Sequence, residues 1–387
     1  MNDIIDPSTM AIILVLILST ATFVSMKGNR VLMTLFAVDL GAGPFETGML
    51  FALYGLLPFL LVVSTGRIAD RFDNRVLMYW GLSGFTVTLT LPFVFPTLPA
   101  LFILAPLTGL TTMLFVVATQ NLIGMLSTPA TRTRNFSYYS LGESSANIVG
   151  PVCVGLSIDQ FHHPVTFLFL ALFTAGCGLL LFARRNTLPR TGNGEEKESA
   201  PRSMKDLLAL PAMRNALLTN GAVMAGVDLF SLYIPVYARG IGLSATAIGM
   251  IIGAFGAAAF ITRLAIPPIT ARWGERAMLA AALALSALAF ISFPLTTSPL
   301  LLGTAAFVLG LGLGCGQPLS MILAFNASPP GRSAEGIAMR LAVSYGAHVV
   351  IPPMFGAIGA GLGLAPIFWS CAVLLGGGSL LNRRKTG

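Results

Sequence analysis

The hydrophobicity pattern of the chain is a series of long apolar runs separated by short charged or Pro/Gly-containing breaks. Each run is close to or above the ~20 residues that a helix needs to cross the hydrocarbon core of a bilayer. The runs are continuously apolar, whereas membrane-spanning strands would alternate in polarity and close into a barrel. The pattern therefore predicts an all-α integral membrane protein. We expect twelve transmembrane helices at residues 10–36, 45–66, 76–96, 99–127, 136–158, 164–183, 212–238, 245–268, 277–297, 299–325, 336–359 and 364–381.

The longest hydrophilic stretch lies midway along the chain, from Arg184 to Pro211. It contains TGNGEEKESAPR, which has the composition of a flexible linker. It separates the runs into two sets of six. We therefore expect an N-terminal six-helix bundle at residues 1–183, a linker at 184–211 and a C-terminal six-helix bundle at 212–387.

A single shift of 201 residues superposes the first set of runs on the second. It aligns Gly48 with Gly249, Gly55 with Gly256, Arg71 with Arg272, Arg75 with Arg276, Gly109 with Gly310, Pro151 with Pro352, Gly155 with Gly356 and Phe167 with Phe368. Glycine is abundant, so one match means little, but one constant offset across several helices indicates a duplicated unit. Two such halves related by an axis along the membrane normal are typical of one class of secondary transporter.

Composition and charge fit the same picture. The chain is 55% hydrophobic and 10% charged, whereas a soluble domain carries about 25% charged residues. The net charge of +8 does not indicate nucleic-acid binding, because the basic residues lie between apolar runs. Eighteen of the 23 Lys and Arg residues fall on the side of the termini, and Arg239 alone falls in the opposite loops. The positive-inside rule then places both termini in the cytoplasm, and we expect a multi-pass protein of the bacterial inner membrane.

Motifs of enzymes, metal sites and ATPases are absent from the sequence. The four cysteines lie inside apolar runs without a CxxC pair, so we expect free thiols and no metal or other cofactor. There is no HExxH, GxSxG or GxxxxGK[ST]. We therefore expect a protein that is not an enzyme, and whose energy, if it transports, comes from an ion or substrate gradient.

Between the second and third predicted helices the chain reads GRIADRFDNRVL, starting at Gly66. A glycine allows two helices to approach closely, and an aspartate at a helix end can meet cations or the positive N-terminus of another helix. The stretch resembles the cytoplasmic motif G-x-L-a-D-R-x-G-R-[KR]-x-x-L of the major facilitator superfamily, with Asp and Asn at 73 and 74 in place of Gly and Arg. The matching residues are Gly66, Asp70, Arg71 and Arg75. The resemblance implies a gating role for Asp70, Arg71 and Arg75; an ordinary basic loop is the alternative.

The fifth predicted helix carries Ala146-xxx-Gly150-Pro151-xxx-Gly155. This resembles the signature G-x-x-x-G-P-x-x-G-G of the same superfamily, which is commoner in exporters. Small residues four apart also serve helix packing, so both interpretations stay open. Many proton-coupled drug exporters of the superfamily have an Arg four residues before a glycine of helix 4; here that position is Ala105, which puts that device in doubt.

Ionisable side chains inside membrane helices are costly and usually face a cavity or a partner. In this chain they are Lys27, Arg30, Glu143, Asp228, Arg263, Arg340 and His348. The excess of cations favours an anionic or zwitterionic solute. As substrate-binding residues we expect Lys27, Arg30, Asp228, Tyr233, Gln317, Arg340 and His348. A histidine can change its charge near neutral pH, so His348 is either a proton sensor or a simple hydrogen-bonding residue.

Two ion pairs are expected among these residues. Asp228 lies 201 residues beyond Lys27, and we expect the two to approach each other across the cavity, unless Lys27 snorkels or Asp228 has another partner. Glu143 and Arg263 each lie nine residues from a basic residue at a cytoplasmic helix end, hence at about the same depth of 13–14 Å. We expect them to form an interdomain gating pair.

These observations predict a monomeric alternating-access secondary transporter of a small anionic or amphipathic organic solute, with protons as a candidate coupling ion. Export driven by an ion gradient is favoured by the helix-5 motif. A proton-coupled importer of a small carboxylate or siderophore-like compound is the alternative within the class. A membrane sensor or assembly protein is the alternative outside it.

Overall fold

The computed structural model describes residues 7–71, 73–189, 208–328 and 333–383. Every regular element in these ranges is helical. The first half comprises α1 (Pro7–Asp39), α2 (Pro44–Arg71), α3 (Asn74–Val94), α4 (Leu98–Leu126), α5 (Pro129–Ala183) and the short 3₁₀ helix η1 (Arg185–Thr187). The second half comprises α7 (Pro211–Gly240), α8 (Ala245–Trp273), α9 (Glu275–Ser292), η2 (Phe293–Leu295), α10 (Pro299–Leu313), α11 (Gly316–Asn326), α12 (Ser333–Leu362) and α13 (Leu364–Arg383).

Eleven helices in the described ranges are long and apolar enough to cross a membrane. One of them, α5, has 55 residues, or about 80 Å at 1.5 Å per residue, which is far more than one crossing needs. Its backbone reverses at His162, where φ is 61° and ψ is 170°. The two arms of α5 are therefore two spans, and the predicted twelve transmembrane helices are confirmed.

The structure differs from the predicted spans at two places. We expected a short loop between residues 158 and 164, but helix continues up to the sharp turn at His162 and again after it. We also expected one helix at 299–325, and the structure divides it into α10 and α11 at Gly314 and Cys315. The three spans concerned remain; only the continuity of their helices was predicted wrongly.

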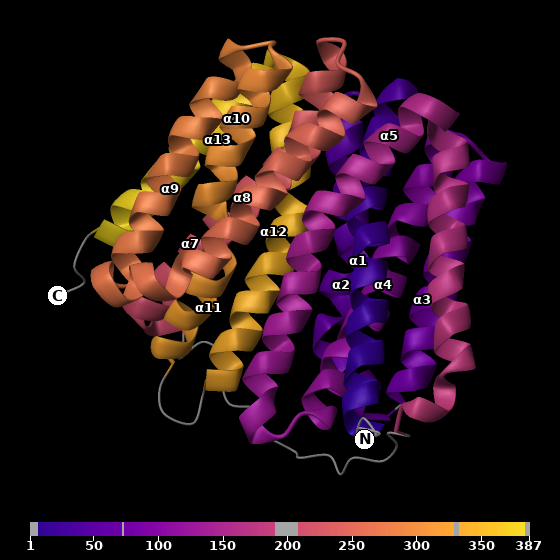
Figure 1. Cartoon of the computed structure of the whole chain (residues 1–387). Helices are drawn as coiled ribbons and strands as arrows, with labels where there is room; N and C mark the ends of the chain where they lie inside the picture. The colour runs from indigo at the N-terminus through magenta and orange to yellow at the C-terminus, as the bar shows by residue number, and fades with distance from the viewer. Residues whose placement is uncertain (1–6, 72, 190–207, 329–332, 384–387) are drawn as a thin grey trace.

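The helices form two bundles side by side, one from α1–α5 and the other from α7–α13 (Figure 1). Helix α5 packs along α8 and helix α2 packs along α12, so two seams join the halves. Because the number of spans is even, the start of α1 and the end of α13 lie at the same end of the molecule. This arrangement confirms the predicted pair of six-helix bundles, while the exact boundaries at residues 183 and 212 stay a prediction.

Glycines allow the backbones to approach closely at both seams. A Cβ atom added at Gly256 in α8 would lie 2.7 Å from the carbonyl oxygen of Asn147 in α5. In the other seam, a Cβ added at Gly48 in α2 would lie 2.6 Å from the carbonyl oxygen of Pro352 in α12, and a Cβ added at its repeat counterpart Gly249 would press on the carbonyl oxygen of Pro151. The glycines that repeat at the 201-residue offset thus have a packing reason, because only a residue without Cβ fits there.

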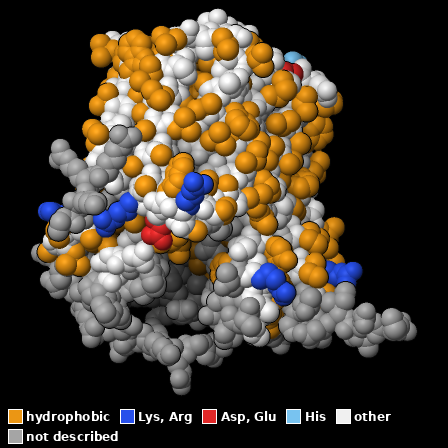
Figure 2. Space-filling model, turned by 60° about the vertical axis from the view of Figure 1, so that its left-hand side comes forward, with side chains coloured by type: hydrophobic (Ala, Val, Ile, Leu, Met, Phe, Trp, Pro, Cys, Tyr) orange, Lys and Arg blue, Asp and Glu red, His pale blue; other side chains and the backbone are white. Residues whose placement is uncertain are grey.

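The sides of the molecule carry the apolar surface that lipid requires. Large hydrophobic side chains are exposed along the helices, among them Ile103, Leu179, Leu288, Leu300 and Val373. Figure 2 shows hydrophobic side chains over most of one face, with Lys and Arg side chains in its lower part. Such a band explains the high hydropathy of the chain and supports a multi-pass membrane protein.

Gly256→Ala tests the seam between α5 and α8. The added methyl group would press on backbone atoms of Asn147 that cannot rotate away, so we expect it to destabilise the protein by about 1–3 kcal/mol. Thermal unfolding of the purified protein in detergent measures the effect. Gly303→Ala is the matched control, because nothing lies within 4 Å of a Cβ at that helical position. Equal melting temperatures for the two variants would contradict the close approach.

Candidate functional site

A cavity of about 270 Å³ lies midway along the helices, between the two halves. Its walls come from α1, α2, α4, α5, α7, α11 and α12. The polar lining residues are Lys27, Arg30, Tyr54, Thr112, Gln120, Tyr139, Glu143, Asp228, Gln317, Tyr345 and His348. A larger hollow of about 700 Å³ lies at the ends of α7, α9, α11 and α13, within the second half alone, and holds none of the predicted site residues. The smaller cavity is therefore the candidate site.

Lys27 forms an ion pair with Glu143, with 3.1 Å between Nζ and Oε1. The predicted pairing of Lys27 with Asp228 is wrong. Helices α1 and α5 approach closely at Gly28 and Gly150, where a Cβ on Gly28 would lie 3.2 Å from the Gly150 carbonyl oxygen. This contact brings Glu143 within reach of Lys27. The two side chains neutralise each other's charge, and both belong to the first half.

Asp228 pairs instead with His348, whose Nδ1 contacts the carboxylate oxygen Oδ2. The Asp228 side chain is fully buried, and its other oxygen, Oδ1, has no hydrogen-bond partner in the described part of the chain. Helix α7 supplies the acid and α12 the imidazole, so the pair lies within the second half. The cavity thus has one carboxylate-containing pair on each side.

Arg30 lacks a carboxylate partner. Its guanidinium lies over the rings of Phe51, at 4.9 Å from the centroid, and Tyr54, at 5.4 Å. Among the described residues no Asp or Glu oxygen lies within 4.0 Å of it. Aromatic faces stabilise a cation only modestly. Arg30 is therefore the cavity's uncompensated positive charge.

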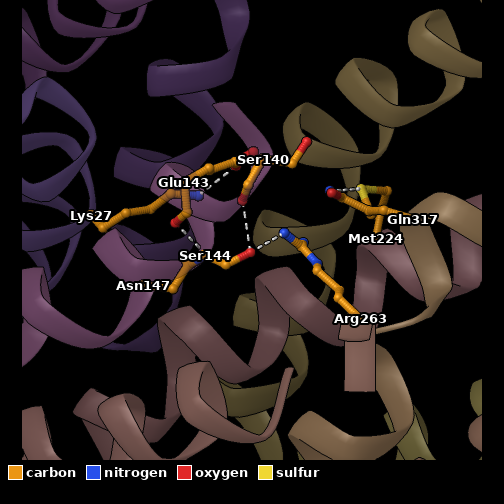
Figure 3. A network of polar contacts seen from close by, with 8 residues as sticks. All are labelled: Lys27, Ser140, Glu143, Ser144, Asn147, Met224, Arg263 and Gln317. Carbon is orange, nitrogen blue, oxygen red and sulfur yellow. Dashed lines mark hydrogen bonds and ion pairs between the residues drawn. The ribbon is translucent and has the colours of Figure 1, made fainter. Parts of the chain in front are cut away.

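Arg263 crosses from α8 to α5, but not to the residue that we predicted. Its Nη1 donates a hydrogen bond to the Ser144 hydroxyl oxygen at 2.5 Å (Figure 3). No ion pair joins Arg263 to Glu143, so that prediction is wrong. Successive residues of a helix point about 100° apart; Glu143 faces α1 and the cavity, whereas Ser144 faces α8. Helices α5 and α8 nevertheless pack against each other.

Two predicted substrate-binding residues lie outside the cavity. Tyr233 is fully buried, and its hydroxyl donates to the carbonyl oxygen of Pro352 at 2.7 Å. Five residues separate it from Asp228, which turns it to another face of α7. Arg340 donates to Asn220 Oδ1 at 3.1 Å and lies eight residues, or about 12 Å, from His348 along α12. Neither residue lines the cavity in this structure, and their predicted contact with substrate stays a prediction.

Gln317 does line the cavity, and its Nε2 lies 3.7 Å from the Met224 sulfur. Sequence reasoning missed Tyr54, Thr112 and Tyr345, which also line it. Each is a single polar residue in an apolar helix, and only the packing of the helices shows which way it points.

The predicted cytoplasmic gating residues are only partly described. The side chains of Asp70 and Arg71 lie outside the described residues. Arg75 donates from Nε to the Pro189 carbonyl oxygen at 2.9 Å, a contact within the first half. Asp73 accepts a hydrogen bond from the Arg75 amide and caps α3. The gating role of this loop stays a prediction.

A charged cluster that the sequence analysis missed closes the end of the molecule opposite the termini. Arg239 forms a two-pronged ion pair with Asp39, with distances of 2.7 and 2.6 Å. His163 lies 3.5 Å from the same carboxylate. Asp159 accepts hydrogen bonds from the amides of Ala245 and Thr246 at the start of α8. We call these four residues, Asp39, Asp159, His163 and Arg239, the outer clamp.

Most cross-half hydrogen bonds in the described ranges lie at the outer clamp end. The sequence contained a feature from which the outer clamp could have been predicted. Arg239 is the single Lys or Arg of the loops on that side, and it lies 200 residues beyond Asp39. At the other side of the cavity Gln120 is exposed. The structure is therefore closed at the clamp end, and the cavity communicates with the end that carries the termini.

Comparison with known proteins identifies relatives over the whole chain. The family model described as Major Facilitator Superfamily matches residues 15–244 and 216–385. The efflux pump azaK of Aspergillus niger is 25% identical over 378 residues, covering 90% of this chain and 80% of that protein. The uncharacterized MFS-type transporter YfiS of Bacillus subtilis is 28% identical over 204 residues, so that match spans 52% of this chain and 49% of YfiS. The crystal structure of the nucleoside transporter NupG has the same fold, with a TM-score of 0.82 at 15% identity over 97% of this chain and 100% of that one.

Arg239→Gln tests the outer clamp. Loss of the two-pronged ion pair should loosen the contact between α1 and α7, and the partial exposure of both side chains limits the effect. We expect the amides at residues 239–249 to exchange about three to ten times faster in hydrogen–deuterium exchange. Arg185→Gln, whose guanidinium lies over Phe182, should leave these amides unchanged. The exchanged pair Asp39→Arg with Arg239→Asp should restore slow exchange; fast exchange in that double variant would count against a clamp.

Proposed function

The chain belongs to the Major Facilitator Superfamily, and on that premise we propose that it is an alternating-access exporter of small organic anions or zwitterions. Its surroundings would be the bacterial inner membrane, with both termini in the cytoplasm. The family places the protein among transporters that are not enzymes. The substrate class, the direction and the coupling ion are the proposal.

The observation that carries the substrate class is the uncompensated charge of Arg30. Lys27 pairs with Glu143, and Asp228 pairs with His348. Among the described residues that line the cavity, Arg30 is the cation that lacks a carboxylate partner. A carboxylate or phosphate group would form a two-pronged contact with its guanidinium.

The remaining walls of the cavity are suited to the other part of such a solute. They combine aromatic rings with hydroxyl and amide groups, as ligand sites generally do. The aromatic members are Phe23, Phe51, Tyr54, Tyr139 and Tyr345. A small amphipathic anion would place its apolar part on these rings and its charge on Arg30.

Export is supported by two observations. The name of azaK describes an efflux pump, and that relative matches 90% of this chain. The glycines and proline of the helix-5 motif also serve the structure: Gly150 packs on α1, and Gly155 packs on the start of α8. They therefore support export only as a resemblance, while packing fully explains their presence.

The position four residues before Gly109, Ala105, lacks the Arg of many proton-coupled exporters, which keeps import of a small carboxylate as the second candidate.

Protons are the proposed coupling ion, and the pair of Asp228 with His348 is the proposed site. Its carboxylate is buried, retains one oxygen without a partner and adjoins the cavity. A proton on this pair would change the charge of the cavity by one unit without any other ion. If the termini are cytoplasmic, as proposed, the closed clamp end faces outward and the structure corresponds to an inward-facing state.

Arg30→Gln tests the substrate class. Benzoate and related aromatic carboxylates should raise the melting temperature of the purified parent protein, since a ligand that binds only the folded state adds RT ln(1 + [L]/Kd), about 2.7 kcal/mol at 100 times Kd. The substitution should abolish that shift. Arg134→Gln, at an exposed site at the start of α5, should retain it. A shift with benzyltrimethylammonium in place of the carboxylates would overturn the anion proposal in favour of a cation.

Asp228→Asn tests proton coupling. The variant should lose substrate-driven proton movement in proteoliposomes that contain a pH-sensitive dye, because its amide cannot be protonated in this range. It should retain at least about a third of the parental rate of substrate exchange, which needs no net proton movement. Proton movement at the parental rate would exclude Asp228 as the coupling group.

A further inference from the structure

The tenth span is interrupted beside the cavity. Helix α10 ends at Leu313 and α11 begins at Gly316. In a continuous helix the carbonyl of Gly314 would accept the N–H of residue 318, but that residue is Pro318, which has no N–H and whose ring would press on that carbonyl. The break places Pro318 in the first turn of α11, where the missing donor has no cost. It also leaves backbone carbonyls of the break without helical partners.

Two consecutive residues of α8 satisfy these carbonyls. Thr262 donates from its hydroxyl to the Leu311 oxygen at 3.1 Å. Arg263 donates from Nε to the Gly314 oxygen at 3.4 Å. Unsatisfied backbone groups at membrane depth are costly, and such breaks persist only where other groups satisfy them. Helix α8 therefore supports the interrupted helix.

Arg263 has a second contact, and it crosses to the other half of the protein. Its Nη1 donates to Ser144 Oγ at 2.5 Å, while the Ser144 hydroxyl donates to the Ser140 carbonyl oxygen at 2.9 Å (Figure 3). The acceptor role of Ser144 is thus assigned by its own donor bond. One planar guanidinium joins the break in the tenth span to α5.

Both ends of this bridge adjoin the cavity. Ser144 directly follows Glu143, which pairs with Lys27. Gln317 lies three residues beyond Gly314 and lines the cavity from the other side. A movement of either cavity wall would therefore shift one of the two groups to which Arg263 donates a hydrogen bond. Arg263 would respond in this way without contacting the solute itself.

We propose that Arg263 is a positioning residue that couples the break between α10 and α11 to α5 across the seam, and thereby stabilises the state that is closed at the outer clamp. The sequence predicted a gating pair of Arg263 with Glu143, whereas this role rests on the contacts of Arg263 with Ser144 and with Gly314. The inference rests on alternating access and not on the substrate or on the direction of transport, so it stands or fails separately from the anion proposal.

The substitution that cuts only the cross-half arm is Ser144→Ala. It leaves the bond from Arg263 to Gly314 intact. We expect the population that is open at the outer clamp to rise about tenfold, because a hydrogen bond to a charged group is lost from the closed state alone. Spin labels at Glu46→Cys and Leu362→Cys, at the exposed outer ends of α2 and α12, report this population as a longer distance by pulsed electron resonance. The labels are introduced into the full-length protein with Cys153 replaced by Ser, because Cys153 is exposed and would otherwise react with the spin label.

Two matched variants separate a coupling role from a general loss of packing. Ser145→Ala removes the neighbouring hydroxyl, which bonds only to Leu141 within α5, and should leave the distance distribution unchanged. Ser144→Thr retains the hydroxyl and should restore the parental distribution. Arg263→Lys retains the charge but cannot reach both partners with a planar group, and should resemble Ser144→Ala. Identical distributions for Ser144→Ala and Ser145→Ala would overturn the proposal, whether or not any anion is transported.

Discussion

The cost of placing charge in hydrocarbon is the constraint on which the rest of this structure depends. Each ionised group within the spans is costly unless it has a partner or water. The chain meets this cost by local pairing: Lys27 with Glu143 in the first half, and Asp228 with His348 in the second. Because each pair lies within one half, neither pair ties the halves together. The halves are joined instead by glycine seams, by contacts at the rim and by the hydrogen bond from Arg263 to Ser144, which is compatible with rocking of one bundle on the other.

The cross-half contacts differ in kind along the molecule. At the clamp end they are charged and partly exposed, as for Arg239 with Asp39, so water can replace them at small cost. At mid-depth the contact is Arg263 with Ser144, which water replaces less readily. Among the described residues, charged contacts at the exposed rim and one guanidinium at mid-depth join the halves. Opening of the closed state would therefore break few polar contacts between them.

Sequence reasoning identified the spans, the two halves and the group of charges, because hydrophobic run length and the 201-residue repeat reflect constraints that hold everywhere along a helix. It failed on partners. Lys27 and Asp228 occupy equivalent positions, but equivalence under a pseudo-twofold axis makes two residues neighbours only if both lie near that axis. Glu143 was expected to reach Arg263 from its depth alone, and depth does not determine which face of α5 a side chain occupies. Tyr233 and Arg340 lie outside the cavity for different reasons: Tyr233 lies on another face of α7, and Arg340 lies too far from His348 along α12.

The two proposals meet at Glu143. An anion bound at Arg30 would lie one helical turn from Lys27, since the two residues are three apart on α1. The anion would compete with Glu143 for Lys27. Release of Glu143 from Lys27 would in turn affect Ser144, the next residue of α5, which accepts the hydrogen bond from Arg263. Recognition of the solute and the contact between the halves are thus two uses of one short segment of α5. In this arrangement the charge of the solute, rather than its shape, would supply the differential interaction between states that any coupled movement requires.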